Sequence, residues 1–308
     1  MKHPMSVTIT LLLFFLTTQL IGLFLVSQVM PVSTAADGSV VVLAPDTAVG
    51  PPPETTEMGA LLLLLAGVTI GTLLILLLVK FRKYNLWKVW FFLAAGLTMT
   101  ISFGVIFGDA LYLVAGLLGF ILAALKVFRP NPYIHNFTEL FIYPGIAVLF
   151  YHILTIPVML ILLAIISVYD IIAVFKSKHM VSMANFQTSS NVFAGLAIPR
   201  ASPSTTKKTI QKTPKSVKKS PNKGSAVAVL GGGDVALPLL FAAVVLKSLV
   251  EIGLSVNVAL SLSAIIALTS TLFLALLFFF SQKGKFYPAM PTVSFGAILG
   301  WIIILLLI

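Results

Sequence analysis

The run PVMLILLAIISVYDIIAVF, residues 157–175, decides the class of fold. A helix needs roughly 20 apolar residues to cross the hydrocarbon core of a bilayer, and this run has that length. Asp170 is the only charged residue within it. Lipid admits only helices or closed barrels, and the run is continuous rather than alternating in the way of a barrel strand. It therefore predicts a transmembrane helix that carries one acid.

The composition of the whole chain agrees with this interpretation. Of 308 residues, 59% are hydrophobic and 9% are charged, against about 25% charged in an ordinary soluble domain. Such a chain cannot cover itself with polar surface, so the lipid bilayer must be its main surroundings. The composition predicts a polytopic membrane protein.

Similar apolar runs lie on both sides of residues 157–175. They predict an all-α polytopic fold of about nine transmembrane helices. The predicted spans are residues 7–29, 59–79, 86–107, 110–126, 139–155, 157–175, 229–249, 254–280 and 288–308. The first run could instead be a cleaved signal peptide, but it is longer than the usual 7–15 apolar residues of a signal core. We expect it to be retained.

The positions of Lys and Arg predict the orientation, because cytoplasmic loops are enriched in both residues. Every second loop is basic, whereas the loop of residues 30–58 has no Lys or Arg. Only Lys247 departs from this alternation. We expect an integral, multi-pass protein of the cell membrane, with its amino terminus in the cytoplasm and its carboxyl terminus outside.

One long polar segment divides the chain. Residues 176–224 are rich in Lys, Ser, Thr and Pro and cannot bury enough apolar surface to become ordered. Its lysines would anchor the topology or attract anionic lipid headgroups. The predicted parts are a six-span part at 1–175 carrying Asp170, a flexible basic cytoplasmic loop at 176–224, and a three-span part at 225–308 carrying Asp234.

Several kinds of site are disfavoured by the residues present. The chain has no cysteine, which excludes disulfides and thiolate ligands. Its four histidines are too scattered for the closely spaced pair of a zinc hydrolase, so we expect neither a metal nor a cofactor. The formal charge of +11 lies in the gaps between apolar runs, which argues against nucleic acid as a partner.

Ionisable residues inside a bilayer are costly and usually functional. Of the nine acidic residues, only Asp170 and Asp234 lie inside apolar runs. Asp109, Glu139 and Glu251 fall near predicted span ends, where we expect water or headgroups to reach them.

The two intramembrane aspartates are expected at similar depth. Asp170 precedes Lys176 by six residues, roughly 9 Å along a helix, and Asp234 follows Lys223 by eleven residues. Both would lie in the cytoplasmic half of the membrane, on antiparallel neighbours. Two adjacent carboxylates cannot both ionise, so they would share one proton, as in aspartic proteases. A transporter or cation leak channel lined by the same aspartates is the alternative.

Glycines and prolines surround the acids. Gly231, Gly232 and Gly233 would cost about 1 kcal/mol each within a helix, so they either allow close helix packing or expose backbone beside Asp234. The preceding residues 225–230 have the composition of a short strand, which could hold an extended substrate by strand addition. Pro288 and Pro291 would leave carbonyls unpaired at the start of the last span. These elements converge at one depth.

Three motifs in this order resemble those of a known family. Tyr169-Asp170 resembles a YD motif, Gly231-Gly232-Gly233-Asp234 resembles GxGD, and Pro288-Ala289-Met290-Pro291 resembles PALP. On the sixth, seventh and ninth predicted spans, they make the chain similar to the presenilin and signal peptide peptidase family of intramembrane aspartyl proteases. Met290 departs from the family pattern, which has Leu, and this swap conserves volume.

The resemblance implies an endopeptidase that cuts within transmembrane segments of other proteins. Asp170 and Asp234 would be its catalytic acids. The residues implied to support the site or the substrate are Tyr169, Gly231, Gly232, Gly233, Pro288, Ala289 and Met290. The basic loop between the sixth and seventh spans predicts the presenilin-like orientation, and the small size resembles a microbial, archaeal-type homologue. A catalytically idle scaffold and a homo-oligomer stay open.

Overall fold

The structure is a computed structural model that describes residues 4–34, 40–44, 55–81, 83–177, 193–199, 227–282 and 287–308. Long helices dominate these ranges, and the all-α polytopic prediction is confirmed. The long helices are α1 (Met5–Gln28), α2 (Glu57–Phe81), α3 (Tyr84–Phe107), α4 (Tyr112–Phe128), α5 (Pro132–Phe150), α6 (Ile156–Ile172), α8 (Gly232–Glu251), α9 (Val256–Phe280) and α10 (Met290–Leu307). Short 3₁₀ and π turns at Asp109–Leu111 and Ala173–Ser177 lie before α4 and after α6.

Seven of the described helices are long and apolar enough to cross a membrane. Helix α4 is equally apolar but has 17 residues. Helix α5 differs, because it buries Asn136, Thr138 and Glu139 on the face that packs against its neighbours. The bundle therefore includes a helix whose buried face carries an acid and two polar side chains.

The prediction for the fifth span was wrong in position. It was set at residues 139–155, whereas α5 begins at Pro132 and ends at Phe150. The expectation that water reaches Glu139 was also wrong, because this side chain is buried. The polar residues before Glu139 suggest a loop in sequence, but in the structure they belong to the first turns of the helix.

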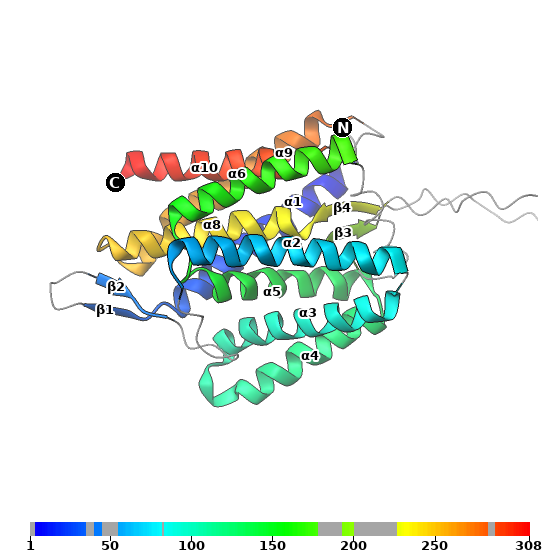
Figure 1. Ribbon diagram of the computed structural model, residues 1–308. Helices are drawn as coiled ribbons and strands as arrows, with labels where there is room; N and C mark the ends of the chain where they lie inside the picture. Colours follow the sequence, from blue (N-terminus) through cyan, green and yellow to red (C-terminus); the bar gives the residue numbers. More distant parts are fainter. Residues whose placement is uncertain are drawn as a thin grey trace, which may run out of the picture.

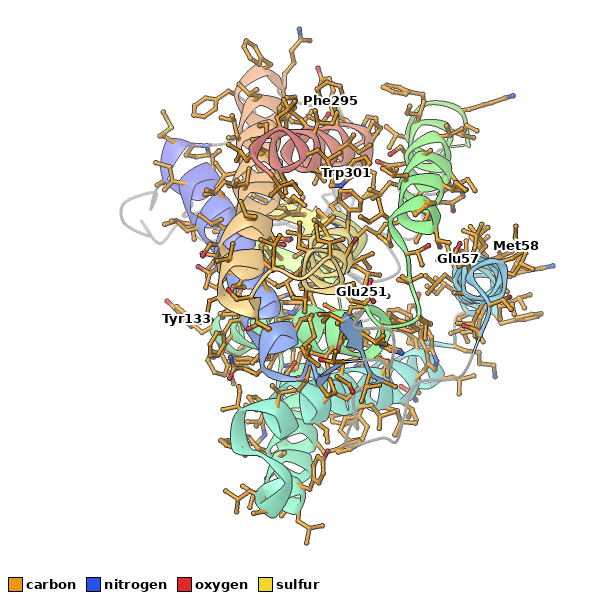
Figure 2. The ribbon with its side chains drawn as sticks, turned by 90° about the vertical axis from the view of Figure 1, so that its left-hand side faces the viewer. Glu57, Met58, Tyr133, Glu251, Phe295 and Trp301 are labelled. Atoms are coloured by element: carbon orange, nitrogen blue, oxygen red, sulfur yellow. The ribbon has the colours of Figure 1, made fainter. Side chains whose placement is uncertain are left out.

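Helix α8 lies at the centre of the bundle. It packs against α1, α5, α6, α9 and α10 (Figure 1), and its middle, including Leu239, Phe241 and Val244, is fully buried. Helix α2 has the opposite character: it contacts α3 and α6 and leaves most of its surface exposed. Figure 2 shows α2 at the edge of the molecule, with Glu57 and Met58 at its start.

Helices α9 and α10 pack closely because glycines on α10 face α9. A Cβ atom at Gly296 would lie 2.9 Å from the Thr269 carbonyl oxygen, and one at Gly300 would lie 2.8 Å from Ile266 Cα. This spacing of small residues allows helix backbones to approach in membranes. Trp301, labelled in Figure 2, packs edge-on against Phe241 of α8 with ring centroids 6.3 Å apart. The middle and second half of α10 thus pack against α9 and α8.

Lys247 of α8 explains its departure from the alternation of basic loops. Its side chain is buried, and its ammonium group donates to the carbonyl oxygens of His152 and Leu154, each at 2.9 Å. These carbonyls lie in the connection between α5 and α6. Lys247 therefore serves an internal contact and says nothing about which side of the membrane is cytoplasmic.

Two short hairpins lie at opposite ends of the bundle (Figure 1). Strands β1 (Val32–Thr34) and β2 (Val40–Val42) follow α1. Strands β3 (Gly195–Pro199) and β4 (Val227–Gly231) pair antiparallel beside the start of α8, with Gly195 opposite Gly231 and Pro199 opposite Val227. Helix α1 begins at the β3–β4 end, whereas α10 ends at the other (Figure 1).

The strand predicted at residues 225–230 corresponds to β4. The prediction that residues 176–224 form one unstructured loop is wrong for Gly195–Pro199, because these residues form β3. These five residues are apolar, and pairing with β4 buries part of their surface. In its sequence, the remainder of the predicted loop is more polar and has a smaller share of apolar residues for such pairing. Most other residues of the predicted loop, including its lysines from Lys207 to Lys223, lie outside the described residues.

Candidate active site

Asp170 lies in the last turn of α6, directly before the π-helical turn of Ala173–Ser177. Its carboxylate is half-buried and accepts a hydrogen bond from the Met290 amide, with 3.2 Å between Met290 N and Asp170 Oδ2. The Ala289 amide contributes a second backbone hydrogen bond. The first amides of a helix have no intrahelical partner, so the start of α10 is suited to hold an anion.

This contact gives the Pro288–Pro291 element a physical role. Pro291 stands in the first turn of α10, where its missing N–H costs nothing. The sequence predicted unpaired carbonyls at this position, but the groups that reach Asp170 are the amides of Ala289 and Met290. The Met290 side chain is buried in the core, so this residue contributes through its backbone.

Asp234 occupies the third position of α8, after Gly231 as N-cap and Gly232 and Gly233 in the first turn. Its carboxylate is half-buried and accepts from the Gly231 amide. The bond reaches back from the third helical residue to the cap, as the acidic member of a capping box does. The positive end of the α8 dipole also favours negative charge at this position.

Each glycine before Asp234 has its own surroundings. A Cβ atom at Gly231 would lie 3.0 Å from Asp234 Oδ2, and one at Gly232 would lie 3.0 Å from the Tyr143 hydroxyl oxygen. At Gly233 nothing lies within 4 Å, and the residue is exposed. The first two glycines make room for side chains of the protein, whereas the third leaves open space beside the acid.

The structure brings the two aspartates together. Helix α6 packs against α8 and α10, and the carboxylates of Asp170 and Asp234 lie close enough to interact electrostatically. Both are also in contact with the amino-terminal end of a helix, α10 for Asp170 and α8 for Asp234. Two neighbouring carboxylates repel each other when both are ionised, so the arrangement favours a pair that holds one proton.

Tyr169 does not share the direction of Asp170. Adjacent residues on a helix point about 100° apart, and the Tyr169 side chain is 40% exposed. Its role in shaping the site stays a prediction. No group of three or more His, Asp or Glu side chains that could hold a metal occurs among the described residues.

Two site neighbours on α5 were missed by the sequence reasoning. Tyr143 is buried, its hydroxyl adjoins Gly232, and it lies within electrostatic reach of Asp234 and Glu139. Glu139 is one helical turn away and forms a buried ion pair with Lys126, with 2.6 Å between Nζ and Oε1. The spacing of Glu139 and Tyr143 at i and i+4 was a readable signal, because it places both side chains on one helix face.

Comparisons with known proteins were made against families, curated sequences and solved structures. The family described as signal-peptide peptidase, presenilin aspartyl protease matches residues 21–308. No curated protein matches the chain significantly in sequence.

Two solved structures of a presenilin family intramembrane aspartate protease resemble this fold. The first, in space group C222, has a TM-score of 0.59 and 18% identity, and the match covers 98% of this chain and 99% of that one. The second, in space group P2, has a TM-score of 0.57 and 19% identity, with 97% of each chain covered. The structural likeness shows a shared fold, and the family match extends over almost the whole sequence. The chain belongs to the signal-peptide peptidase and presenilin family of aspartyl proteases.

Proposed function

We propose that Asp170 and Asp234 are the catalytic pair and that they hydrolyse peptide bonds within transmembrane segments of other proteins. The observation that carries this proposal is the meeting of two intramembrane carboxylates, one held by the first amides of α10 and the other in the first turn of α8. Backbone amides fix both groups without neutralising them. The pair can therefore hold one proton between an acid and a base.

The proposed reaction needs only this proton and one water molecule. The ionised carboxylate takes a proton from water as the water oxygen bonds to the scissile carbonyl carbon, and the protonated partner gives its proton to the carbonyl oxygen. The resulting diol collapses as the C–N bond breaks. One proton passes to the leaving nitrogen and one returns to the pair, which ends with a single proton as it began.

The test uses purified protein in detergent with a model transmembrane substrate. We expect Asp170→Asn and Asp234→Asn each to lower kcat by more than about 10³-fold, because each removes either the acid or the base. Glu251→Gln is the matched control, since Glu251 is an exposed acid at the far end of α8. Retained cleavage in both asparagine variants would reject the catalytic pair. Ion flux that depends on both aspartates, without cleavage, would favour the cation channel.

We also propose that the substrate adds as an extended strand to the outer edge of β4. The Gly232 amide donates to the Ala194 carbonyl at 3.2 Å, and in an antiparallel pair every second residue bonds to the partner strand. The residues two and four positions before Gly232 therefore bond to β3. The backbone groups of Val227, Val229 and Gly231 therefore point outward. The outer edge of β3 is different, because side chains of α5 cover it. Among the described residues, β4 makes its main contacts with β3 and α8, which leaves its outer edge open for pairing, and this edge leads directly to Asp234.

Strand addition is tested by removing one outward amide. Val229 is 47% exposed and its N–H lies on the open edge of β4, so Val229→Pro should lower cleavage by about tenfold or more because one hydrogen bond to the substrate is lost. Val229→Thr keeps the amide and the branched shape and should cleave like the parent. Equal activity of the proline and threonine variants would exclude this edge as the substrate site.

The orientation is proposed as cytoplasmic for the amino terminus and outside for the carboxyl terminus. The basic loops support it, and so does the position of the α10 end opposite the start of α1 (Figure 1). A reporter fused after Ile308 should be accessible from outside the cell. A reporter found only in the cytoplasm would invert the assignment and place the β3–β4 end outside.

A further inference from the structure

Helix α5 holds strand β3 through the side chain of Asn136. The Asn136 Nδ2 group donates to the Ala197 carbonyl at 2.9 Å, and the Ala197 amide donates to Asn136 Oδ1 at 3.0 Å. A side-chain amide thus makes the two bonds that a neighbouring strand would make. Because Asn136 is buried, these bonds are shielded from water, and they fix the position of β3 along α5.

The preceding residue makes a second contact with β3. His135 Nε2 lies 2.7 Å from the Gly195 carbonyl oxygen, and His135 Nδ1 lies 3.2 Å from Lys126 Nζ. A carbonyl oxygen only accepts, so Nε2 carries the hydrogen. A lysine ammonium only donates, so Nδ1 must accept. Lys126 therefore selects the tautomer of His135 that can bind β3.

Lys126 is itself held by a buried acid. Lys126 Nζ lies 2.6 Å from Glu139 Oε1, with both side chains about 1% exposed, and it donates to Thr138 Oγ1 at 3.1 Å. An apolar pair of similar volume often stabilises a protein as well as a buried ion pair does. Stability alone is thus a weak reason for this pair. In this structure, the ion pair holds the Lys126 ammonium group against His135.

Helix α5 also contacts the start of α8 directly. Strand β3 pairs with β4, and β4 continues without a break through Gly231 into the turn that carries Asp234. One turn after Glu139, the Tyr143 side chain packs against Gly232. Helix α5 therefore touches both ends of the path that leads to Asp234: the outer strand of the hairpin and the first turn of α8.

We propose that Lys126, Glu139, His135 and Asn136 are positioning residues, which form a clamp that fixes the β3–β4 hairpin and, through it, Asp234 and the substrate edge of β4. This rests on the proposed function, because the hairpin matters for cleavage only if Asp234 is catalytic. A displacement of about 1 Å at a reacting group can cost up to about 100-fold in rate. The clamp acts on geometry and does not touch the reacting atoms.

The clamp makes a prediction about which bond is cut. A hairpin that shifts along α5 presents a different substrate residue to the aspartates. Loss of the clamp should therefore spread cleavage over neighbouring peptide bonds and lower kcat about 10- to 100-fold. A residue that only stabilises the fold would lower the melting temperature without changing the products.

The experiment compares variants that all retain Asp170 and Asp234. Asn136→Leu removes both bonds to Ala197, and His135→Leu removes the bond to Gly195. His135→Gln keeps an amide donor near the place of Nε2 and should recover most of the lost rate. The double variant K126M/E139L replaces the ion pair with apolar groups, so it should fold and still lose rate and product fidelity.

The readouts are kcat and KM, the cleaved bonds by mass spectrometry, and amide hydrogen exchange of residues 193–199. We expect faster exchange at Ala197 in Asn136→Leu even where activity is too low to measure. Ile266→Ala is the control for plain destabilisation, because this fully buried side chain lies on α9, which carries no residue of the clamp or of the catalytic pair. It should lower the melting temperature and keep the parent products.

Parent rates, parent products and slow exchange in Asn136→Leu and in the double variant would overturn the clamp. The same follows if His135→Gln is no better than His135→Leu in both rate and products. Failure of the proposed function is recognised separately, because cleavage would then survive in the Asp170→Asn and Asp234→Asn variants whatever the clamp variants do.

Discussion

Backbone amides, rather than charged side chains, hold both aspartates. Asp170 accepts from Met290 and Ala289, and Asp234 accepts from Gly231. A lysine or arginine in this position would bind one carboxylate as an ion pair and keep it ionised. Amides orient the carboxylates and still allow a proton to move between them, which suits a pair that must act as acid and base in turn.

Gly231 and Gly233 should respond differently to alanine. In Gly231→Ala the new Cβ would press on Asp234 Oδ2 at 3.0 Å, so we expect kcat to fall about tenfold. The backbone at Gly231, with φ −63° and ψ 147°, suits alanine, so the melting temperature should change little. In Gly233→Ala the protein offers open space, so a loss of rate there would report on the substrate. Comparing both variants by kcat, KM and thermal melting separates the two effects.

The shared proton predicts a bell-shaped dependence of kcat on pH. At low pH both carboxyls are protonated and the base is lost, whereas at high pH both are ionised and the acid is lost. The rate should therefore fall on both sides of a maximum, and the two limbs belong to the pair rather than to either residue. A profile with one limb only, measured with the same substrate in detergent, would contradict the shared proton.

At the scale of elements, Lys247 joins the centre of the bundle to the connection between α5 and α6. Its two bonds to the His152 and Leu154 carbonyls lie about 20 Å from Asp234, at 1.5 Å per helical residue. We expect Lys247→Met to lower the free energy of unfolding by about 1–3 kcal/mol, because buried carbonyls lose their donor. Thermal melting measures this, and kcat of the folded fraction should stay near the parent value. Lys80→Met, at an exposed lysine of α2, is the control.

How far the sequence predicted the elements depended on their polarity. Long apolar helices such as α6, α8 and α9 were located within a few residues, because lipid demands length and apolarity. Helix α5 was misplaced, since its first turns carry polar side chains that bind β3 and Lys126. Strand β3 was missed because its five residues lie far from β4 in sequence and are ordered only by that pairing and by α5.

The candidate site was predicted where its residues are unusual in the sequence and was missed where packing decides. Acids within apolar runs and glycine or proline elements are visible in one sequence, so Asp170, Asp234 and their flanking residues were selected. Which groups bind the carboxylates depends on how α10 lies against α6, and this is a matter of packing. Glu139 was assigned to a span end and Tyr143 was not selected, because their importance depends on how α5 packs against α8.

At the scale of the whole molecule, packing is concentrated around α8, while α2 lies at the rim (Figure 2). Leu239 of α8 is fully buried and packs against Gly22 of α1. Leu239→Ala should lower the free energy of unfolding by about 2–5 kcal/mol, since it leaves a cavity. Leu73→Ala on the exposed face of α2 should change it little. Thermal melting of the two variants in one detergent would test this, and similar losses would argue against a core centred on α8.

The proposed pairing of substrates with the outer edge of β4 has a consequence for the choice of substrate. An edge strand recognises the peptide groups that all residues share, so side-chain identity contributes little to its affinity. What distinguishes one membrane-spanning partner from another is then the cost of unravelling its helix at the right depth. Segments with glycine or β-branched residues near the cleaved bond lose the least helix-forming free energy on unwinding. The protease would therefore select substrates by local helix instability rather than by a sequence motif.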